Sequence, residues 1–145
     1  MIMSDALACP LTSPRTGAIA VILLDGNDSA SVVSKLFRPA SGNFYVRDDG
    51  LFYGRWLSAP GGDPIDDALV LTRPASQSNT RRIQIEAHLH GSPILVADAL
   101  DTLAAQGATI ATYSAVLERA VRDRKLTRIE LEAELAAPAA QTEKQ

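Results

Sequence analysis

Residues 81–106 constrain the fold of this chain most, because they predict a strand, a turn and a helix in direct succession. A strand is expected over residues 81–90, because apolar and polar side chains alternate from Arg82 to His90. Gly91–Pro93 then combines a residue suited to a tight turn, a helix N-cap and a first-turn proline. Apolar residues recur at helical spacing over residues 94–106. The segment is therefore expected to anchor a sheet with a helix packed against it.

Three ionisable side chains fall on one face of the predicted strand, because side chains repeat every two residues: Glu86, His88 and His90. A carboxylate among apolar strand residues needs a partner if it is buried. One hypothesis is that these three residues bind a metal ion, since imidazoles and carboxylates are common ligands. A simpler interpretation is that one histidine packs in the core while the other bonds to backbone at the turn.

The rest of the chain predicts a mixture of strands and helices. Strands are expected at residues 5–12 (or a disordered arm there), 18–24, 66–72 and 108–111, with a hairpin formed by 43–46 and 51–57. Helices are expected at 28–37, from Ser114, and from a capping box at Thr127–Glu130, and loops at 38–42 and 74–80. These elements predict an α+β fold, a small mixed sheet with helices packed on one face. Residues 1–137 are expected to form one domain and residues 138–145 a disordered tail.

Charge and motif content argue against several functional classes. The net charge of −3 is not that of a free-standing nucleic-acid binder, which usually has a basic footprint. The basic cluster at residues 119–125 is expected to be a solvated helix face. No apolar run approaches the length of a membrane span, and the acidic N-terminus is a poor secretion signal, so we expect a cytoplasmic protein. The single cysteine, Cys9, can form no internal disulfide.

Several short segments share their order and spacing with one known family. The segment Glu86–Pro93 is similar to a Glu-x-His-x-His-Gly-Gly-Pro motif, and Lys35–Pro39 to Lys-Leu-Phe-x-Pro. Residues 18–26 are similar to its Gly-x-Gly-Ile-x-Arg-x-Ser-Gly strand, and residues 12–17 stand where it has Thr-Pro-Pro-Gly-Arg-Gly. Over about residues 5–135 the chain therefore resembles the N-terminal domain of the tRNA-modification GTPase TrmE, also called MnmE.

This resemblance implies a homodimer that binds 5-formyltetrahydrofolate or a related reduced folate at the dimer interface. The implied fold is similar to a folate-binding domain of glycine-cleavage T protein. The family's binding residues are a glutamate, a lysine and a second-strand arginine, which fall on Glu86, Lys125 and Leu23, so the strand cation is missing. A carboxylate can accept paired hydrogen bonds from the amino group and ring N–H of a pterin. Supporting positions are His88, His90, Gly91 and Arg119.

The sequence also departs from the family. Ser92 replaces its second glycine, and the polar residues 80–82 replace its Gly-Glu-Asp loop. The GTPase and helical domains have no counterpart, and no Gly-x-x-x-x-Gly-Lys-Ser/Thr stretch is present, so we expect no direct GTP binding. No complete catalytic constellation is present either, which indicates a protein that is not an enzyme.

Three hypotheses follow from the sequence. The leading one is a stand-alone homodimeric module that binds a tetrahydrofolate derivative, weakly because of Leu23, and serves a partner protein of tRNA wobble-uridine modification or one-carbon metabolism. A dimer is also expected because exposed sheet edges need covering. The alternative is a structural or regulatory dimer that has lost folate binding. The third is a small metal-dependent enzyme that uses Glu86, His88 and His90.

Overall fold

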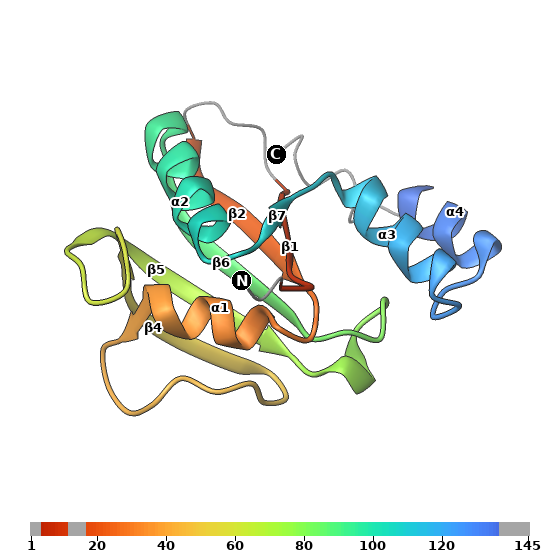
Figure 1. Ribbon diagram of the computed structural model, residues 1–145, viewed down its shortest axis with the longest axis horizontal. Helices are drawn as coiled ribbons and strands as arrows, with labels where there is room; N and C mark the ends of the chain where they lie inside the picture. The colour runs from red at the N-terminus through yellow and green to blue at the C-terminus, as the bar shows by residue number, and fades with distance from the viewer. Residues whose placement is uncertain (1–3, 12–16, 137–145) are drawn as a thin grey trace.

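A seven-stranded mixed sheet forms the centre of the computed structural model, which describes residues 4–11 and 17–136 (Figure 1). Its strand order is β3-β4-β5-β6-β2-β1-β7, and β1 with β7 is the one parallel pair among the described strands. The strands are β1 (Leu7–Pro10), β2 (Gly17–Asp25), β3 (Phe37–Pro39), β4 (Gly50–Leu57), β5 (Pro64–Arg73), β6 (Gln84–Gly91) and β7 (Thr109–Ile110). The helices are α1 (Ser29–Leu36), α2 (Pro93–Ala105), α3 (Tyr113–Arg122) and α4 (Arg128–Ala136), with a 3₁₀ turn at Ala75–Gln77. The predicted α+β class and mixed sheet are confirmed.

The main core lies between one face of the sheet and helices α1 and α2. Alternation along β2 directs Ile22 and Leu24 to this face, where they are fully buried. Trp56 on β4 is also fully buried, and its Nε1 donates a hydrogen bond of 2.9 Å to Thr102 Oγ1 on α2. This buried indole fixes α2 over the sheet.

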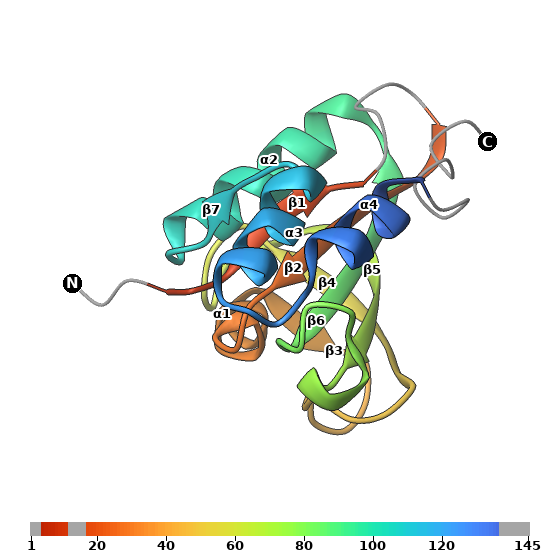
Figure 2. The ribbon, with the colours of Figure 1, turned by 90° about the vertical axis from the view of Figure 1, so that its right-hand side faces the viewer.

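Helix α3 packs against the opposite face and α4 packs against α3, so the prediction that the helices lie on one face holds only for α1 and α2 (Figure 2). Cys9 on β1 and Leu23 on β2 point away from the main core and are buried beneath Val116 of α3. The predicted burial of the strand at 18–24 on both faces therefore holds for Ile22, Leu23 and Leu24, whereas Ile19 is exposed. The second apolar face of this strand needs its own cover, which a helix from the end of the domain provides.

The helix starts follow the capping chemistry in the sequence. Ser92 caps α2, which begins at the following proline, as predicted. The Thr127 hydroxyl accepts from Glu130 N at 3.0 Å while the Glu130 carboxylate accepts from Thr127 N at 2.9 Å, which confirms the capping box. Helix α3 begins one residue before the predicted Ser114, because Thr112 supplies its cap.

The predicted hairpin between 43–46 and 51–57 is wrong. Residues 43–46 form no strand, because Phe44 packs its ring edge-on against Phe52 at 5.1 Å instead of entering the sheet. The partner of β4 on this side is β3, which occupies the start of the predicted loop at 38–42. A Cβ at Gly54 would lie 2.1 Å from a backbone oxygen of β3, so glycine permits this close pairing.

Both edges of the sheet are short. The edge strand β3 has three residues and β7 has two, and very short edge strands are one way in which proteins avoid edge-to-edge pairing. The predicted tail at 138–145 and most of the predicted loop at 12–17 lie outside the described residues. Within the described ranges, no helix is both long and apolar enough to cross a membrane.

Candidate ligand-binding site

A cavity of about 780 Å³ lies between the second face of the sheet and helices α3 and α4. Its volume falls within the range of roughly 300–1,000 Å³ that small-molecule sites commonly have. Strands β2, β5 and β6 supply its floor, and the start of α3 and the end of α4 supply its wall. The lining residues that bear on ligand chemistry are Leu23, Arg73, Gln84, Glu86, Tyr113 and Glu134.

Glu86 on β6 provides a carboxylate at the floor of this cavity. The strand register places it between Leu23 on β2 and Leu71 on β5. His88 Nε2 lies 3.1 Å from Glu86 Oε1, and Arg73 Nη2 lies 3.7 Å from Glu86 Oε2. The hydrogen bond from His88 is the main cause that lowers the pKa of Glu86; burial opposes it, and the charges of His88 and Arg73 reinforce it. Glu86 is therefore an ionised acceptor at neutral pH.

The simpler interpretation of the two histidines is wrong. It expected one histidine to pack in the core and the other to bond to backbone at the turn. His88 is partly exposed and bonds to Glu86, whereas the exposed His90 places its Nδ1 2.6 Å from Asp66 Oδ1. The His90 backbone N–H also donates to Asp66 Oδ2 at 2.8 Å. Strand β6 itself supplies the carboxylate beside His88, and the neighbouring strand β5 supplies the one beside His90. In the part of the chain that is described, no group of three or more His, Cys, Asp or Glu side chains is placed to hold a metal ion.

The contact with Asp66 predicts a pH-dependent property of His90. Its hydrogen bond and negative charge, with a smaller effect of Asp67, raise the pKa of His90 above 6.5. A raised folded-state pKa stabilises the fold fully below pH 6.5, and this contribution is lost as pH rises through the folded-state pKa. An NMR titration of the His90 ring protons should show a higher pKa in the native protein than in Asp66→Asn. Asp67→Asn is the control and should change the pKa less; an unchanged His90 pKa in Asp66→Asn would contradict the assignment.

Of the predicted site residues, Glu86 and Leu23 line this cavity, whereas His88, His90, Gly91, Arg119 and Lys125 do not. Lys125 follows the C-terminal end of α3, whereas Tyr113 at its N-terminal end lines the cavity. Ten helical residues span about 15 Å, so Lys125 is far from the cavity wall. Gly91 ends β6 opposite Gly17 and also lies outside the lining residues. The proposed ligand roles of Glu86 and Lys125 remain predictions.

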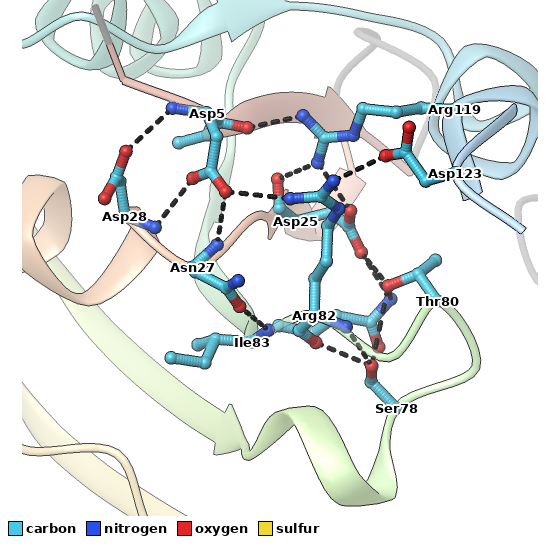
Figure 3. A network of polar contacts seen from close by, with 12 residues as sticks. Asp5, Asp25, Asn27, Asp28, Ser78, Thr80, Arg82, Ile83, Arg119 and Asp123 are labelled. Atoms are coloured by element: carbon cyan, nitrogen blue, oxygen red, sulfur yellow. Dashed lines mark hydrogen bonds and ion pairs between the residues drawn. The ribbon is translucent and has the colours of Figure 1, made fainter. Parts of the chain in front are cut away.

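Arg119, predicted to support the site from a solvated helix face, is instead largely buried in a polar network (Figure 3). Its guanidinium donates to Asp25 Oδ1 and to the Asp25 carbonyl oxygen, both at 2.8 Å, and to the Asp5 carbonyl oxygen at 2.5 Å. Arg82 connects Asp5 to Asp123 on the other side of the network. We call this cluster the Asp25 network; it comprises Asp5, Asp25, Asn27, Asp28, Ser78, Thr80, Arg82, Arg119 and Asp123. It ties α3 to the segment just before β1, to the end of β2 and to the loop before β6, and so positions one wall of the cavity.

Arg73 and Gln84 also line the cavity, although the sequence did not indicate them as site residues. Gln84 Oε1 accepts from Arg73 Nη1 at 2.9 Å, and Gln84 Nε2 donates to Asp25 Oδ2 at 2.9 Å and Asn79 Oδ1 at 3.0 Å. Asn79 in turn donates to the Tyr113 hydroxyl at 3.2 Å. Burial is the main cause that raises the pKa of Tyr113. The one available signal was the position of Arg73 at the end of a predicted strand, but the sequence does not give the register between β5 and β6.

Comparisons with known proteins agree with one another. A family model described as the GTP-binding protein TrmE N-terminus matches residues 6–125. The chain is similar to the tRNA modification GTPase MnmE of Chloroflexus aurantiacus, with 32% identity over 140 residues. It is also similar to the proteins of the same name from Desulfotalea psychrophila, with 26% identity over 141 residues, and Synechococcus sp., with 30% over 139. These matches cover 97%, 97% and 93% of this chain, which spans about 30% of the length of each relative.

Proposed function

Because the chain belongs to the family of the TrmE N-terminus, we propose that it is a homodimeric binding module of tRNA modification that takes a reduced folate such as 5-formyltetrahydrofolate. The chain matches the N-terminal part of this family, and we assign a binding role to that part. The observation that carries the proposal is the Glu86 carboxylate at the floor of a cavity of about 780 Å³.

The chemistry of the cavity fits one end of such a ligand. A carboxylate accepts two parallel hydrogen bonds when a ligand presents two adjacent donors, and the 2-amino group and ring N–H of a pterin form such a pair. The bond from His88 occupies one side of Glu86 Oε1, which leaves further acceptor positions on both carboxylate oxygens. The partly buried phenol ring of Tyr113 lines the same cavity and offers a surface for a flat ring, and it packs against the cluster that contains the buried Leu23.

Leu23 favours a second candidate function, a dimer that has lost its ligand. It lies directly opposite Glu86, is 3% exposed, and packs against Cys9 and Val116. It therefore fills the position of the family's strand arginine with apolar surface. A charge-assisted hydrogen bond contributes roughly 1.5–3 kcal/mol, so its loss weakens binding about ten- to a hundredfold.

Calorimetric titration with 5-formyltetrahydrofolate tests the proposed site. Glu86→Gln is expected to weaken binding about tenfold or more, because the amide nitrogen cannot accept from the ligand donors. Glu132→Gln, an exposed carboxylate on α4 outside the cavity, is the matched control and should bind as the native protein does. Leu23→Arg, checked first for cooperative unfolding because Leu23 is buried, should bind about ten- to a hundredfold more tightly than native. If neither the native protein nor folded Leu23→Arg binds any reduced folate, the non-binding dimer is the better account.

An uncovered part of the second sheet face supports the homodimer. Helix α3 covers part of β1 and β2, whereas Leu51, Tyr53 and Leu69 on β4 and β5 stay exposed. Ile19 on β2 is also exposed and borders a smaller cavity of about 280 Å³ with Tyr53 and Leu69. Grouped exposed apolar residues often mark interaction sites. Since the sheet edges are short, this face supports a dimer better than the edges do.

Sedimentation at micromolar concentration should give about twice the chain mass of 15.4 kDa. Leu69→Lys should shift the mass to that of a monomer, because it places a charge in the proposed interface. Ile129→Lys, at an exposed position on α4, is the control and should remain dimeric. A native monomer at this concentration would remove the dimer from the proposal, and a dimeric Leu69→Lys would place the interface elsewhere.

A further inference from the structure

We propose that Arg73 on β5 determines the specificity of the cavity by donating to a ring carbonyl oxygen of the ligand, beside the donor pair that Glu86 accepts. Glu86 and Arg73 together would then recognise a heterocycle that presents an amino group, a ring N–H and a carbonyl oxygen along one edge. Arg73 on β5 would thus provide the cation that is missing on β2, where Leu23 stands in place of the family's arginine. The inference rests on the proposed function, since it concerns the same cavity.

The strand register places the two charged groups side by side. Arg73 pairs with Gln84, two residues before Glu86, so both side chains emerge on the same face of neighbouring strands. Arg73 Nη2 lies 3.7 Å from Glu86 Oε2, and both residues line the cavity. A ligand edge that lies across this pair therefore meets an acceptor and, next to it, a donor.

A buried amide holds the guanidinium in place. Gln84 is 3% exposed, and its Nε2 donates to two acceptors, Asp25 Oδ2 and Asn79 Oδ1. This arrangement fixes the orientation of the amide and directs Gln84 Oε1 to Arg73 Nη1 at 2.9 Å. A guanidinium carries five N–H donors, more than its contacts with Gln84 and Glu86 use, so donors remain for a ligand. The guanidinium is thus positioned before any ligand arrives, which reduces the entropy that binding must remove.

The ion pair between Arg73 and Glu86 does not prevent a ligand from binding. Their closest atoms are 3.7 Å apart, longer than a hydrogen bond, and the side chains are 44% and 24% exposed. Pairs of this kind contribute little to stability, so a ligand can bridge the two groups at small cost. Among the described residues that line the cavity, Arg73 is the one cation, whereas Glu86 and Glu134 are carboxylates. A ligand acceptor in the cavity therefore has Arg73 as its charged donor.

Calorimetric titrations of matched arginine variants test the inference. The ligands are 5-formyltetrahydrofolate and 6-methyltetrahydropterin, which keeps the ring edge but has no glutamyl tail. Arg73→Gln is expected to weaken both about ten- to a hundredfold, and Arg73→Lys less, because a charge remains without the planar fork. Arg55→Gln is the control, because Arg55 lies on the same sheet face, pairs with Asp67 at 2.9 Å and is outside the cavity. It should bind both ligands as the native protein does.

The outcomes separate this inference from the proposed function. If Arg73→Gln binds as tightly as native while Glu86→Gln binds weakly, the role of Arg73 is wrong and the folate site stands. If Arg73→Gln loses affinity only for the full folate, Arg73 contacts the glutamyl tail and the ring assignment is overturned. If the native protein binds neither ligand, the proposed function itself fails, and this inference with it. Guanosine carries the same edge of an amino group, a ring N–H and a carbonyl oxygen. If guanosine binds more tightly than 6-methyltetrahydropterin, the ligand of the cavity is a guanine derivative and the assignment of a folate is wrong.

Discussion

Replacement of Asp25 by alanine should lower the free energy of unfolding by about 3–5 kcal/mol, because it breaks a buried ion pair from one side. Asp25 is 0% exposed, and its carboxylate accepts from Thr80 at 2.5 Å, from Gln84 at 2.9 Å and from Arg119 at 2.8 Å. Without it, Arg119 would be left largely buried with its carboxylate partner gone. Urea unfolding followed by circular dichroism, at one fixed chain concentration, measures the change.

The exposed pair of Arg55 and Asp67 is the matched control for this experiment. Its side chains are 55% and 47% exposed, and such pairs contribute about 0–1 kcal/mol, so Asp67→Ala should have a small effect. If Asp25→Ala lowers the free energy of unfolding no more than Asp67→Ala does, the Asp25 network does not hold α3 on the sheet. Because Gln84 bonds to Asp25, Asp25→Ala should also disturb the floor of the cavity.

Trp56→Ala is expected to destabilise the fold by a similar amount, about 3–5 kcal/mol. Trp56 is fully buried between the sheet and α2, so its removal leaves a large cavity and breaks the bond from its Nε1 to Thr102. Trp56 is the single tryptophan, so unfolding of the variant must be followed by circular dichroism. The change in urea midpoint at constant slope gives the loss of stability.

Two further variants calibrate the effect of Trp56. Trp56→Phe keeps most of the buried ring and should cost clearly less than Trp56→Ala. Ile94→Ala, at an exposed position on α2, should change the stability by no more than about 0.5 kcal/mol. Should Trp56→Ala unfold at nearly the native urea concentration, the indole would not be the contact that fixes α2.

Features set by neighbours along the chain could be predicted from the sequence. The strand that ends near His90, the cap at Ser92 and the capping box at Thr127–Glu130 all occur as expected. Each depends on side-chain periodicity or on a backbone N–H only a few residues away, so no knowledge of the fold is needed. The resemblance to the TrmE N-terminal domain was also visible in the order of its motifs, and the family match over residues 6–125 confirms it.

Features that depend on contacts between distant segments, such as the neighbours of Glu86 and the burial of Arg119, were decided by the tertiary structure. The sequence placed Glu86 on a strand face, but the register of β5 against β6 brings Arg73 beside it. Arg119 was expected in a solvated helix face, yet the packing of α3 against β1 and β2 buries it next to Asp25. A one-residue change of register would turn a strand's side chains to the other face, and local periodicity alone does not specify which strands pair or in what register. The sequence alone therefore determined the candidate acceptor, Glu86, whereas the cation beside it and the wall of the cavity follow from the three-dimensional arrangement of the strands.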